Sequence, residues 1–282
     1  SIMPREQLLT LSEDLIKIKT KAINWTGGGE PTVNPSLKEA VQLVSKSPVK
    51  MGMFTNGTML DKFDLFETLA DNMSWVRLSI DAGTEESYNN IRRVKPAYDW
   101  NKMVSNMKEL IRVRNKSGSK MDIGVGFVLT PDNYTEIIEF AKFFNEFDIA
   151  YCQFKPEIVN KEREGGKQRT LEFFNNLKPY FTEAESILGD KFQVNDYKVT
   201  DLKEDRNFFG RTYKKCLGSQ VSPCVGADGN VYVCTNHRGY KQYSYGSIYD
   251  KSFIDIWNDI SVRNNIMKVI EEEEEFSNCT AL

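Results

Sequence analysis

The chain has 282 residues, of which 40% are hydrophobic and 27% charged, and it carries a formal net charge of −3. This composition is typical of a globular protein with one barrel-sized domain and a smaller appendage. The slight negative charge argues against broad, nonspecific nucleic-acid binding. No apolar run is long enough to cross a membrane, and the N-terminus has no signal-peptide core, so we expect a cytoplasmic protein without a membrane segment.

Helical and strand patterns alternate along the first 155 residues. Apolar residues at helical spacing predict a helix over residues 4–18, and four further helices follow it. The short apolar runs between the helices predict strands at 21–25, 51–55, 75–81, 123–129 and 151–154. Such alternation implies right-handed βαβ units and an all-parallel sheet. Because the sequence opens on a helix, we expect a sixth strand before residue 1, which gives an α/β fold with a partial (β/α)6 TIM-like barrel.

The first predicted strand ends in three glycines, an acid and a proline, at residues 27–31. Consecutive glycines indicate a turn with close backbone approach, and we expect a positive φ at Gly28. Pro31 restrains Glu30 to an extended backbone, so the carboxylate is held at the end of the strand where α/β folds bind ligands. This turn suits an amino-acid-like ligand, because Glu30 and backbone carbonyls accept from an ammonium group. An ordinary Gly-Pro turn is the alternative.

Gly28-Gly29-Glu30-Pro31, at the end of a second strand, resembles the GGEP motif of the radical S-adenosylmethionine (SAM) superfamily. In that superfamily the motif's backbone holds the amino group of the methionine part of SAM. The resemblance covers almost all of residues 4–282 and implies a partial barrel that binds SAM.

The ends of the next two predicted strands also carry polar residues. Ser79 and Asp81 lie on one face of a strand by its period of two, so both can point at one ligand. The resemblance implies that Asn56, Ser79 and Asp81 contact the ribose and the methionine carboxylate of SAM, and that Arg92 belongs to the same site. An ordinary Asn-Gly turn at Asn56 and an exposed basic helix end at Arg92 are the alternatives.

The composition changes after the fifth strand. Residues 161–167 form a charged, glycine-containing linker, and a helix and a strand near 191–199 are predicted after it. We therefore expect three parts: a partial barrel over 1–155, a linker segment over 156–215, and a small cysteine-rich domain over 216–282.

Four of the five cysteines follow residue 215, namely Cys216, Cys224, Cys234 and Cys279. Five cysteines are too few for a disulfide scaffold, so their clustering indicates a metal or cluster site. A predicted hairpin over residues 227–233, with an Asp-Gly turn, delivers Cys234 beside its neighbours. From the residues alone, an iron–sulfur cluster, a four-cysteine zinc site and ordinary reduced thiols remain open. Cys152 is predicted to be a core residue, and His237 a solvated loop residue.

The spacing of this segment resembles the SPASM or shorter twitch extension of radical SAM enzymes. Gly229 is followed by four residues and Cys234, and Tyr245-Gly246-Ser247-Ile248 precedes an Ile256-Trp257 helix. The resemblance implies that Cys216, Cys224, Cys234 and Cys279 bind an auxiliary [4Fe-4S] cluster. Because a full SPASM domain binds two clusters with more cysteines, we expect a single auxiliary cluster.

The sequence contains no CxxxCxxC, the triplet that the superfamily uses after its first strand to bind the SAM-cleaving cluster. We therefore expect the first strand, the triplet and the catalytic [4Fe-4S] cluster on a segment upstream of Ser1. The resemblance implies an enzyme that cleaves SAM reductively to a 5′-deoxyadenosyl radical, which abstracts hydrogen from a peptide or small-molecule substrate, with an electron donor protein as partner. The alternative is a non-catalytic SAM-binding or partner-binding protein with a structural zinc. No catalytic residue is assigned.

Overall fold

The computed structural model describes residues 2–93, 95, 98–157, 166–194 and 216–272. Its larger part is a six-stranded sheet in the order β1-β2-β3-β4-β5-β6, in which every neighbouring pair is parallel. The strands are β1 (Ala22–Trp25), β2 (Lys50–Thr55), β3 (Trp75–Ser79), β4 (Asp122–Leu129), β5 (Tyr151–Pro156) and β6 (Phe192–Val194). The α/β class and the parallel partial barrel are therefore confirmed.

The sixth strand of the described sheet is β6, which lies within the strand predicted near 191–199, and the strand expected before residue 1 stays a prediction. β6 pairs with β5, so it belongs to the barrel sheet although it lies in the segment that we assigned to the linker. Its three residues are too few for a period to stand out in the sequence, and only its pairing with β5 identifies it as part of the sheet.

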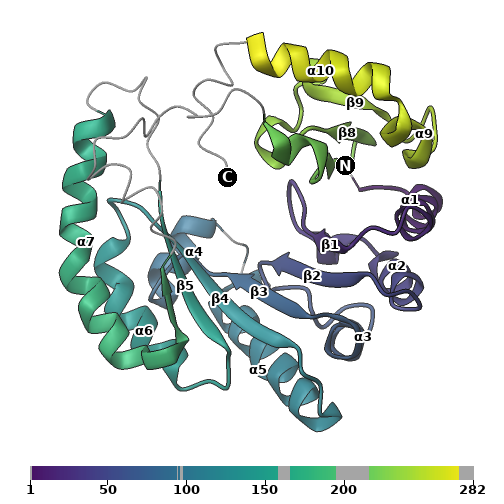
Figure 1. Ribbon diagram of the computed structural model, residues 1–282. Helices are drawn as coiled ribbons and strands as arrows, with labels where there is room; N and C mark the ends of the chain where they lie inside the picture. Colours follow the sequence, from purple (N-terminus) through teal and green to yellow (C-terminus); the bar gives the residue numbers. More distant parts are fainter. Residues whose placement is uncertain (1, 94, 96–97, 158–165, 195–215, 273–282) are drawn as a thin grey trace.

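Helices cover the convex side of the curved sheet (Figure 1). They are α1 (Arg5–Lys17), α2 (Leu37–Val44), α3 (Leu65–Asn72), α4 (Glu85–Arg92), α5 (Trp100–Ser117), α6 (Ile137–Asn145) and α7 (Gly166–Leu188). Short 3-10 turns occur at η1 (Pro31–Val33), η3 (Tyr134–Glu136), η4 (Gly189–Lys191), η5 (Leu217–Gln220), η6 (Thr235–His237) and η7 (Lys241–Tyr243). No helix in the described ranges is both long enough and apolar enough to span a bilayer.

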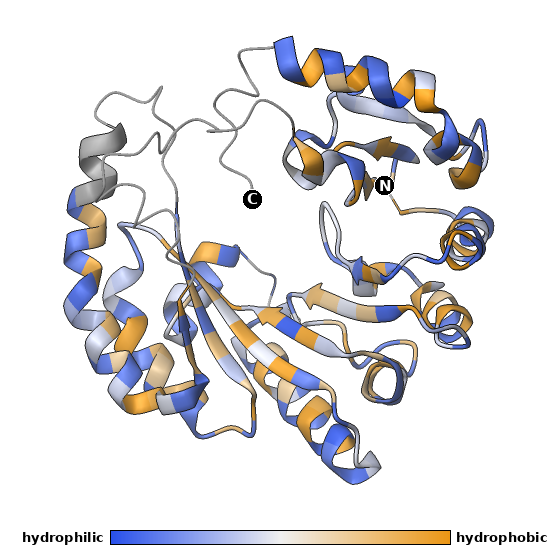
Figure 2. Ribbon diagram, viewed as in Figure 1, coloured by the Kyte–Doolittle hydropathy of each residue, from blue (hydrophilic) through white to orange (hydrophobic). Residues whose placement is uncertain are grey.

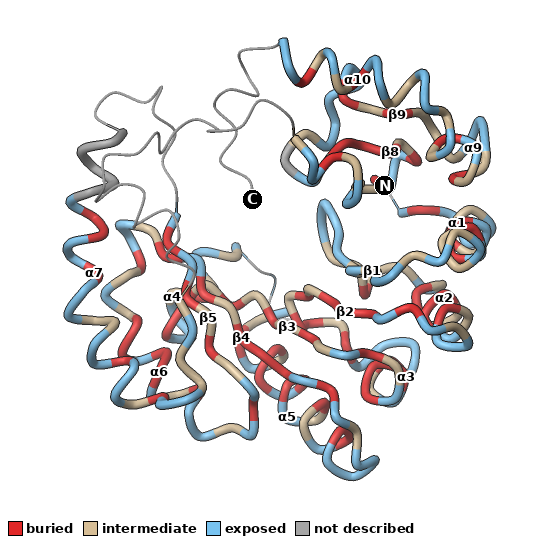
Figure 3. Tube along the Cα trace, in the orientation of Figure 1, coloured by how far each residue is buried: buried red, intermediate tan, exposed pale blue. Residues whose placement is uncertain are grey.

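The core lies between the sheet and these helices. On β3, Val76 and Leu78 are fully buried toward the helices, whereas Arg77 and Ser79 on the opposite face are half-buried. The other central strands alternate in the same way, and hydrophobic residues dominate them (Figures 2 and 3). Cys152 is fully buried in this core as predicted, and burial raises the pKa of its thiol to about 12.

A smaller antiparallel sheet of β7 (Cys224–Val225), β8 (Asn230–Tyr232) and β9 (Ser244–Ser247) packs with α9 (Phe253–Asn258) and α10 (Ile260–Glu272). The predicted hairpin is present, and Gly229 in its turn has φ +81°. Cys234 follows β8 rather than lying on it, because the chain turns into η6 there.

Helix α1 joins this small unit to the barrel. Leu8 and Leu11 of α1 share one apolar cluster with Tyr243 and Phe253 of the small unit. The buried Asp14 carboxylate accepts a hydrogen bond from the Phe253 backbone N–H at 2.9 Å, so it satisfies one of the free donors at the start of α9. Figure 1 shows α1 lying beside the C-terminal unit. The two parts therefore share a packed interface.

Candidate functional site

The ends of β1, β2 and β3 bring the predicted SAM-binding residues to one edge of the sheet. The glycine turn follows β1, Asn56 follows β2, and Ser79 ends β3. Parallel strands place these carboxyl ends together at the mouth of the barrel. A separate hollow of about 450 Å³ lies at the turns that precede β3 and β4, which is the opposite end of the strands, and it forms no part of this site.

The Glu30 carboxylate joins the turn after β1 to the end of β2. Its Oε1 accepts hydrogen bonds from the backbone N–H of Thr32 at 3.1 Å, the Thr32 hydroxyl at 2.7 Å and the Thr55 hydroxyl at 2.7 Å. Its Oε2 accepts one from the Asn56 N–H at 2.6 Å. The carboxylate is thus committed to protein donors, which differs from the expectation that it accepts from a ligand. The backbone carbonyls of the turn remain for an ammonium group.

The glycines of this turn are explained by close approach rather than by positive φ. None of residues 27–29 is among the positive-φ positions, so that expectation for Gly28 is wrong. A Cβ on Gly28 would lie 3.0 Å from the Arg238 guanidinium, whereas a Cβ on Gly29 would meet nothing within 4 Å. Pro31 opens η1, with Glu30 as its N-cap. The turn therefore keeps open space at Gly29 into which a ligand can approach the backbone.

Ser79, Asp81 and Arg92 come together as predicted. Arg92 Nη2 donates to the Ser79 carbonyl at 2.5 Å and to Asp81 Oδ2 at 2.6 Å. Asp81 Oδ1 accepts from the Val128 N–H at 2.8 Å, and its backbone has φ 63°, a strained value for a non-glycine residue. Asn133 holds this bend by donating to the Asp81 carbonyl at 3.0 Å. Four contacts therefore fix the Asp81 carboxylate, its strained backbone and the Arg92 guanidinium at the mouth of the barrel.

Asn56 is placed at the same edge, but its side-chain oxygen has local partners. Oδ1 accepts from the Thr58 N–H at 2.9 Å and from the Thr58 hydroxyl at 2.8 Å. This is the Asx-type turn that the sequence left open as an alternative. Any contact of Asn56 with a ligand therefore comes from its NH₂ group.

Tyr88 is a member of this cluster that sequence reasoning missed. It is fully buried, and its hydroxyl has no hydrogen-bond partner in the described part of the chain. Burial raises the pKa of this hydroxyl, and the Arg92 guanidinium, 5.9 Å from the ring centroid, opposes that rise. The Arg92 Nε is also buried without a described partner. The i, i+4 spacing of Tyr88 and Arg92 on α4 is the signal that links them.

Buried donors without partners are costly, so they point to a missing ligand. The mouth of the barrel offers backbone carbonyls for an ammonium group, a guanidinium for a carboxylate, and open space at Gly29. The zwitterionic end of SAM's methionine carries these two charged groups. The residues present therefore fit SAM.

We expect Gly29→Ala to weaken SAM binding about tenfold or more while leaving the unliganded protein as stable as before. The added methyl meets no protein atom, but it occupies the space beside the turn, and loss of glycine flexibility in the unfolded chain offsets any cost. Calorimetric SAM titration and thermal unfolding of the same sample test both halves. Unchanged affinity at unchanged stability would mean that SAM does not approach this turn.

Three of the predicted metal-ligating cysteines lie in the small unit, and Cys279 lies outside the described residues. Cys216, Cys224 and Cys234 are all half-buried, and none of them forms a disulfide with a described residue. Burial raises the pKa of Cys224, the Arg238 guanidinium opposes this, and Cys234 adds to it. Within the described ranges, no three His, Cys, Asp or Glu side chains stand in position for a single metal ion. Cysteine thiolates are the usual ligands of iron–sulfur clusters, so the residue type of these three positions fits such a cluster.

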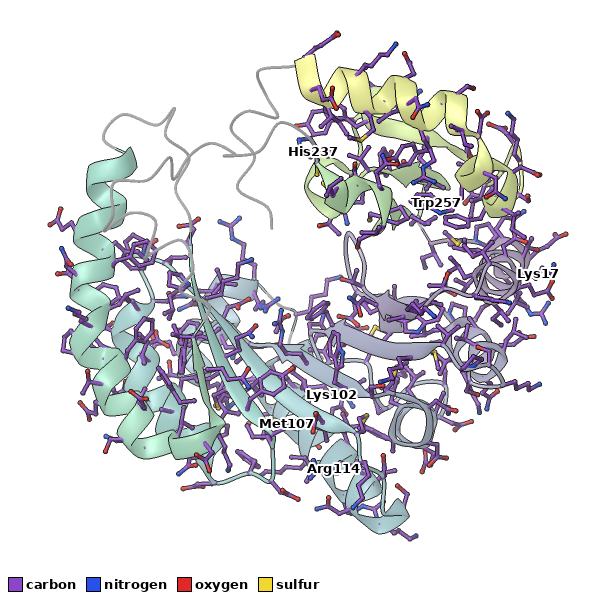
Figure 4. The ribbon with its side chains drawn as sticks, viewed as in Figure 1. Lys17, Lys102, Met107, Arg114, His237 and Trp257 are labelled. Atoms are coloured by element: carbon purple, nitrogen blue, oxygen red, sulfur yellow. The ribbon has the colours of Figure 1, made fainter. Side chains whose placement is uncertain are left out.

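His237 differs from its prediction as a solvated loop residue. Its side chain is half-buried, with Nδ1 3.2 Å from Cys234 Sγ and its ring edge-on to Tyr243 at 4.9 Å between centroids (Figure 4). The 3-10 turn η6 causes this, because it folds residue 237 back onto Cys234. His237 therefore belongs to the surroundings of the cysteine site.

Arg238 lies between the two candidate sites. Its guanidinium packs against Gly28 of the glycine turn, and its charge acts on the Cys224 thiol. Sequence reasoning did not single it out, because the contact joins residues 210 positions apart (238 − 28). The glycine turn and the cysteine unit are thus neighbours in space.

Comparisons with known families match the two parts of the chain in which these candidate sites lie. A family model described as the radical SAM superfamily matches residues 1–144, and one described as the SPASM iron–sulfur cluster-binding domain matches residues 216–281. A protein of Pyrococcus furiosus that modifies the cofactor of tungsten-containing aldehyde ferredoxin oxidoreductase is 25% identical, over 99% of this chain and 78% of its own. A cysteine-type anaerobic sulfatase-maturating enzyme of Clostridium novyi is 25% identical, over 89% and 68%.

Two solved structures share the fold. SuiB of Streptococcus suis, bound to its precursor peptide SuiA, has a TM-score of 0.67 at 14% identity over 99% of this chain and 63% of its own. Native anSMEcpe with bound AdoMet has a TM-score of 0.60 at 18% identity over 99% of this chain and 80% of its own. At these identities the likeness concerns the fold alone. The chain spans less than two thirds of SuiB.

Proposed function

Because the chain belongs to the radical SAM superfamily, we propose that it is the SAM-binding and auxiliary-cluster part of a radical SAM enzyme acting on a peptide or small-molecule substrate. The observation that carries this proposal is the convergence of the glycine turn, Asp81 and Arg92 at one edge of the sheet, with the Arg92 Nε buried and unpartnered among described residues. In the proposal, the CxxxCxxC triplet and its [4Fe-4S] cluster lie upstream of Ser1.

The proposed roles of the residues at the barrel mouth differ. The backbone around Gly28 and Gly29 receives the ammonium group of SAM, and Arg92 donates to its carboxylate. Glu30 and Pro31 shape the turn, Asp81 orients Arg92, and Asn56 and Ser79 lie on the ribose side. When bound and reduced, the cluster and SAM supply a 5′-deoxyadenosyl radical that removes hydrogen from the substrate. The protein's part is to bind, orient and exclude water.

The proposed role of residues 216–282 is to hold an auxiliary [4Fe-4S] cluster through Cys216, Cys224, Cys234 and Cys279. A cluster there would receive or pass electrons, and an external electron donor protein would be its partner. The packing of the Arg238 guanidinium against Gly28 supports this role, because it places the cysteine-containing unit beside the proposed SAM site. Within the segment expected to be a linker, α7 and β6 would serve as part of the barrel wall, since β6 pairs with β5.

SAM cleavage by the full-length protein tests this proposal. Anaerobically reconstituted protein with dithionite and SAM is expected to release 5′-deoxyadenosine and methionine in equal amounts, and Arg92→Ala is expected to lower the rate at least tenfold, since a charged hydrogen-bond donor is lost. Iron and acid-labile sulfide should be present. Protein that binds zinc, contains no iron and forms no 5′-deoxyadenosine would support the non-catalytic alternative and contradict the proposal.

A further inference from the structure

The concave face of the sheet, which lines the barrel, has an aromatic floor below the SAM site. The Trp75 indole covers Gly52 of β2, where a Cβ would lie 2.1 Å from the ring, and the Tyr151 ring covers Gly124 of β4 in the same way at 2.2 Å. Trp75 also packs against Phe54, with ring centroids 4.8 Å apart. Each ring thus lies over a glycine of the strand next to its own, and both rings come from the first residue of their strands, at the lower end of the barrel.

Arg77 lies above this floor, in the middle of β3 and on the concave face. It is two residues before Ser79 on the same face, which is about 7 Å along the strand. Its guanidinium stacks on Phe54 with 4.3 Å to the ring centroid, and its Nη1 donates to Gln153 Oε1 on β5. The side chain crosses Gly126 of β4, where a Cβ would come within 3.3 Å of Nε. It therefore spans three strands inside the barrel.

No carboxylate neutralises this guanidinium in the described part of the chain. None of the ion pairs formed by described residues includes Arg77, and its Nε is buried without a hydrogen-bond partner. Asp81, the carboxylate whose charge acts on Arg77, follows the end of β3 and has its two oxygens committed to Val128 N–H and Arg92. An unpaired arginine in a partly buried position is costly unless a partner arrives with the ligand.

A second cation lies on the same face. Lys155 is two residues after Gln153 on β5, is exposed, and makes no ion pair with described residues. Because strand residues two apart share a face, Gln153 and Lys155 both point toward the barrel interior. The Gln153 amide thus lies in a row that leads from the Arg77 guanidinium to Lys155 at the mouth.

We propose that the Arg77 guanidinium, with Gln153 beside it, is an anion subsite inside the barrel that holds a carboxylate or phosphate group of the substrate. The subsite rests on the proposed function and deepens it, because it names a chemical feature of the substrate. A planar guanidinium can donate two parallel hydrogen bonds to the oxygens of either a carboxylate or a phosphate. Its place one pleat below Ser79 would bring a neighbouring C–H of the substrate toward SAM at the mouth of the barrel.

Binding of two simple anions to the full-length protein, in the presence of SAM, tests the subsite. Inorganic phosphate and succinate are titrated separately by calorimetry into wild type, Arg77→Gln and Arg112→Gln. Arg112 is a matched control, because it is an exposed arginine on α5 that pairs with Glu109. We expect at least one anion to bind wild type and Arg112→Gln equally, and about tenfold more weakly to Arg77→Gln, since one charged hydrogen-bond pair is lost.

A second measurement needs no variant and covers the case in which Arg77→Gln does not fold. Phenylglyoxal labels accessible arginines, and mass spectrometry reports the labelling rate of each. Phosphate or succinate should slow the labelling of Arg77 several-fold and leave that of Arg112 unchanged. Protection by phosphate alone indicates a phosphate-bearing substrate, protection by succinate alone a carboxylate, and protection by both a subsite that accepts either group.

The outcomes separate this inference from the proposed function. If SAM binds but neither anion binds wild type or protects Arg77, the anion subsite is wrong and the SAM site stands. Equal anion affinity of wild type and Arg77→Gln would overturn the subsite in the same way. If SAM itself does not bind, the proposed function fails whatever the anions do.

Discussion

Glu30→Ala is expected to weaken SAM binding at least 100-fold and to destabilise the protein by about 2–4 kcal/mol. The Glu30 carboxylate accepts four hydrogen bonds that tie the glycine turn to Thr55 and Asn56 at the end of β2. Hydrogen bonds to a charged group contribute roughly 1.5–3 kcal/mol each, and their donors would be left without this acceptor. The turn would then lose the shape in which its carbonyls face the ligand. Calorimetric SAM titration and denaturant unfolding measure the two effects.

Glu39→Ala is the control for this experiment. Glu39 lies on α2, is exposed, and pairs only with the exposed Arg5 among described residues. Exposed ion pairs contribute about 0–1 kcal/mol, so its SAM affinity should equal that of wild type. Glu30→Gln should also weaken SAM binding and lower the stability of the protein. The glutamine NH₂ group cannot accept a hydrogen bond, so at least one of the four donors would lose its acceptor. If Glu30→Ala bound SAM within about threefold of wild type, the turn would not depend on this carboxylate.

Cys234→Ala is expected to remove the auxiliary cluster, which lowers bound iron by about four atoms per chain. Cluster ligands act together, so the C-terminal unit should also become sensitive to protease. Because Leu8 and Leu11 share its apolar cluster and Asp14 bonds Phe253, the loosening should extend to α1 while the rest of the barrel stays folded. Iron analysis and limited proteolysis with mass mapping measure this.

Two further variants complete this test: Cys152→Ala is the negative control, and Cys279→Ala replaces another proposed cluster ligand. Cys152 is fully buried in the barrel core, so its loss should leave the iron content unchanged. Cys279 lies outside the described residues, and as a proposed ligand it should behave like Cys234 when replaced by alanine. Equal iron in Cys234→Ala and Cys152→Ala would exclude Cys234 from the cluster site. Iron loss in Cys234→Ala but not in Cys279→Ala would leave the fourth ligand to another residue.

Much of the fold follows from local patterns in the sequence. The alternation of 3.6-residue and two-residue periods predicted the helices of the barrel other than α4, and the first five strands, because each buries one face. The glycine turn and the polar strand ends were found because strand interiors between them are apolar. β6 was not recognised as a barrel strand, because a three-residue strand has no period of its own.

The contacts within the site depended on long-range packing. Glu30 meets Thr55 and Asn56 across 25 and 26 residues, so no local pattern shows that its carboxylate is already occupied. Arg77 was read as part of an apolar strand, and only its lack of a counter-charge marks it as unusual. The positive φ expected at Gly28 was wrong, because the neighbour that requires a glycine there, Arg238, comes from the other end of the chain.

A crystal structure of the full-length protein with SAM tests the central claim most directly. It should show the methionine ammonium group within hydrogen-bond distance of the carbonyl oxygens of residues 27–29, and the methionine carboxylate within reach of Arg92. Glu30 should keep its contacts with Thr32, Thr55 and Asn56. SAM bound at the opposite end of the strands, or away from both the glycine turn and Arg92, would contradict the assignment of the barrel mouth as the SAM site.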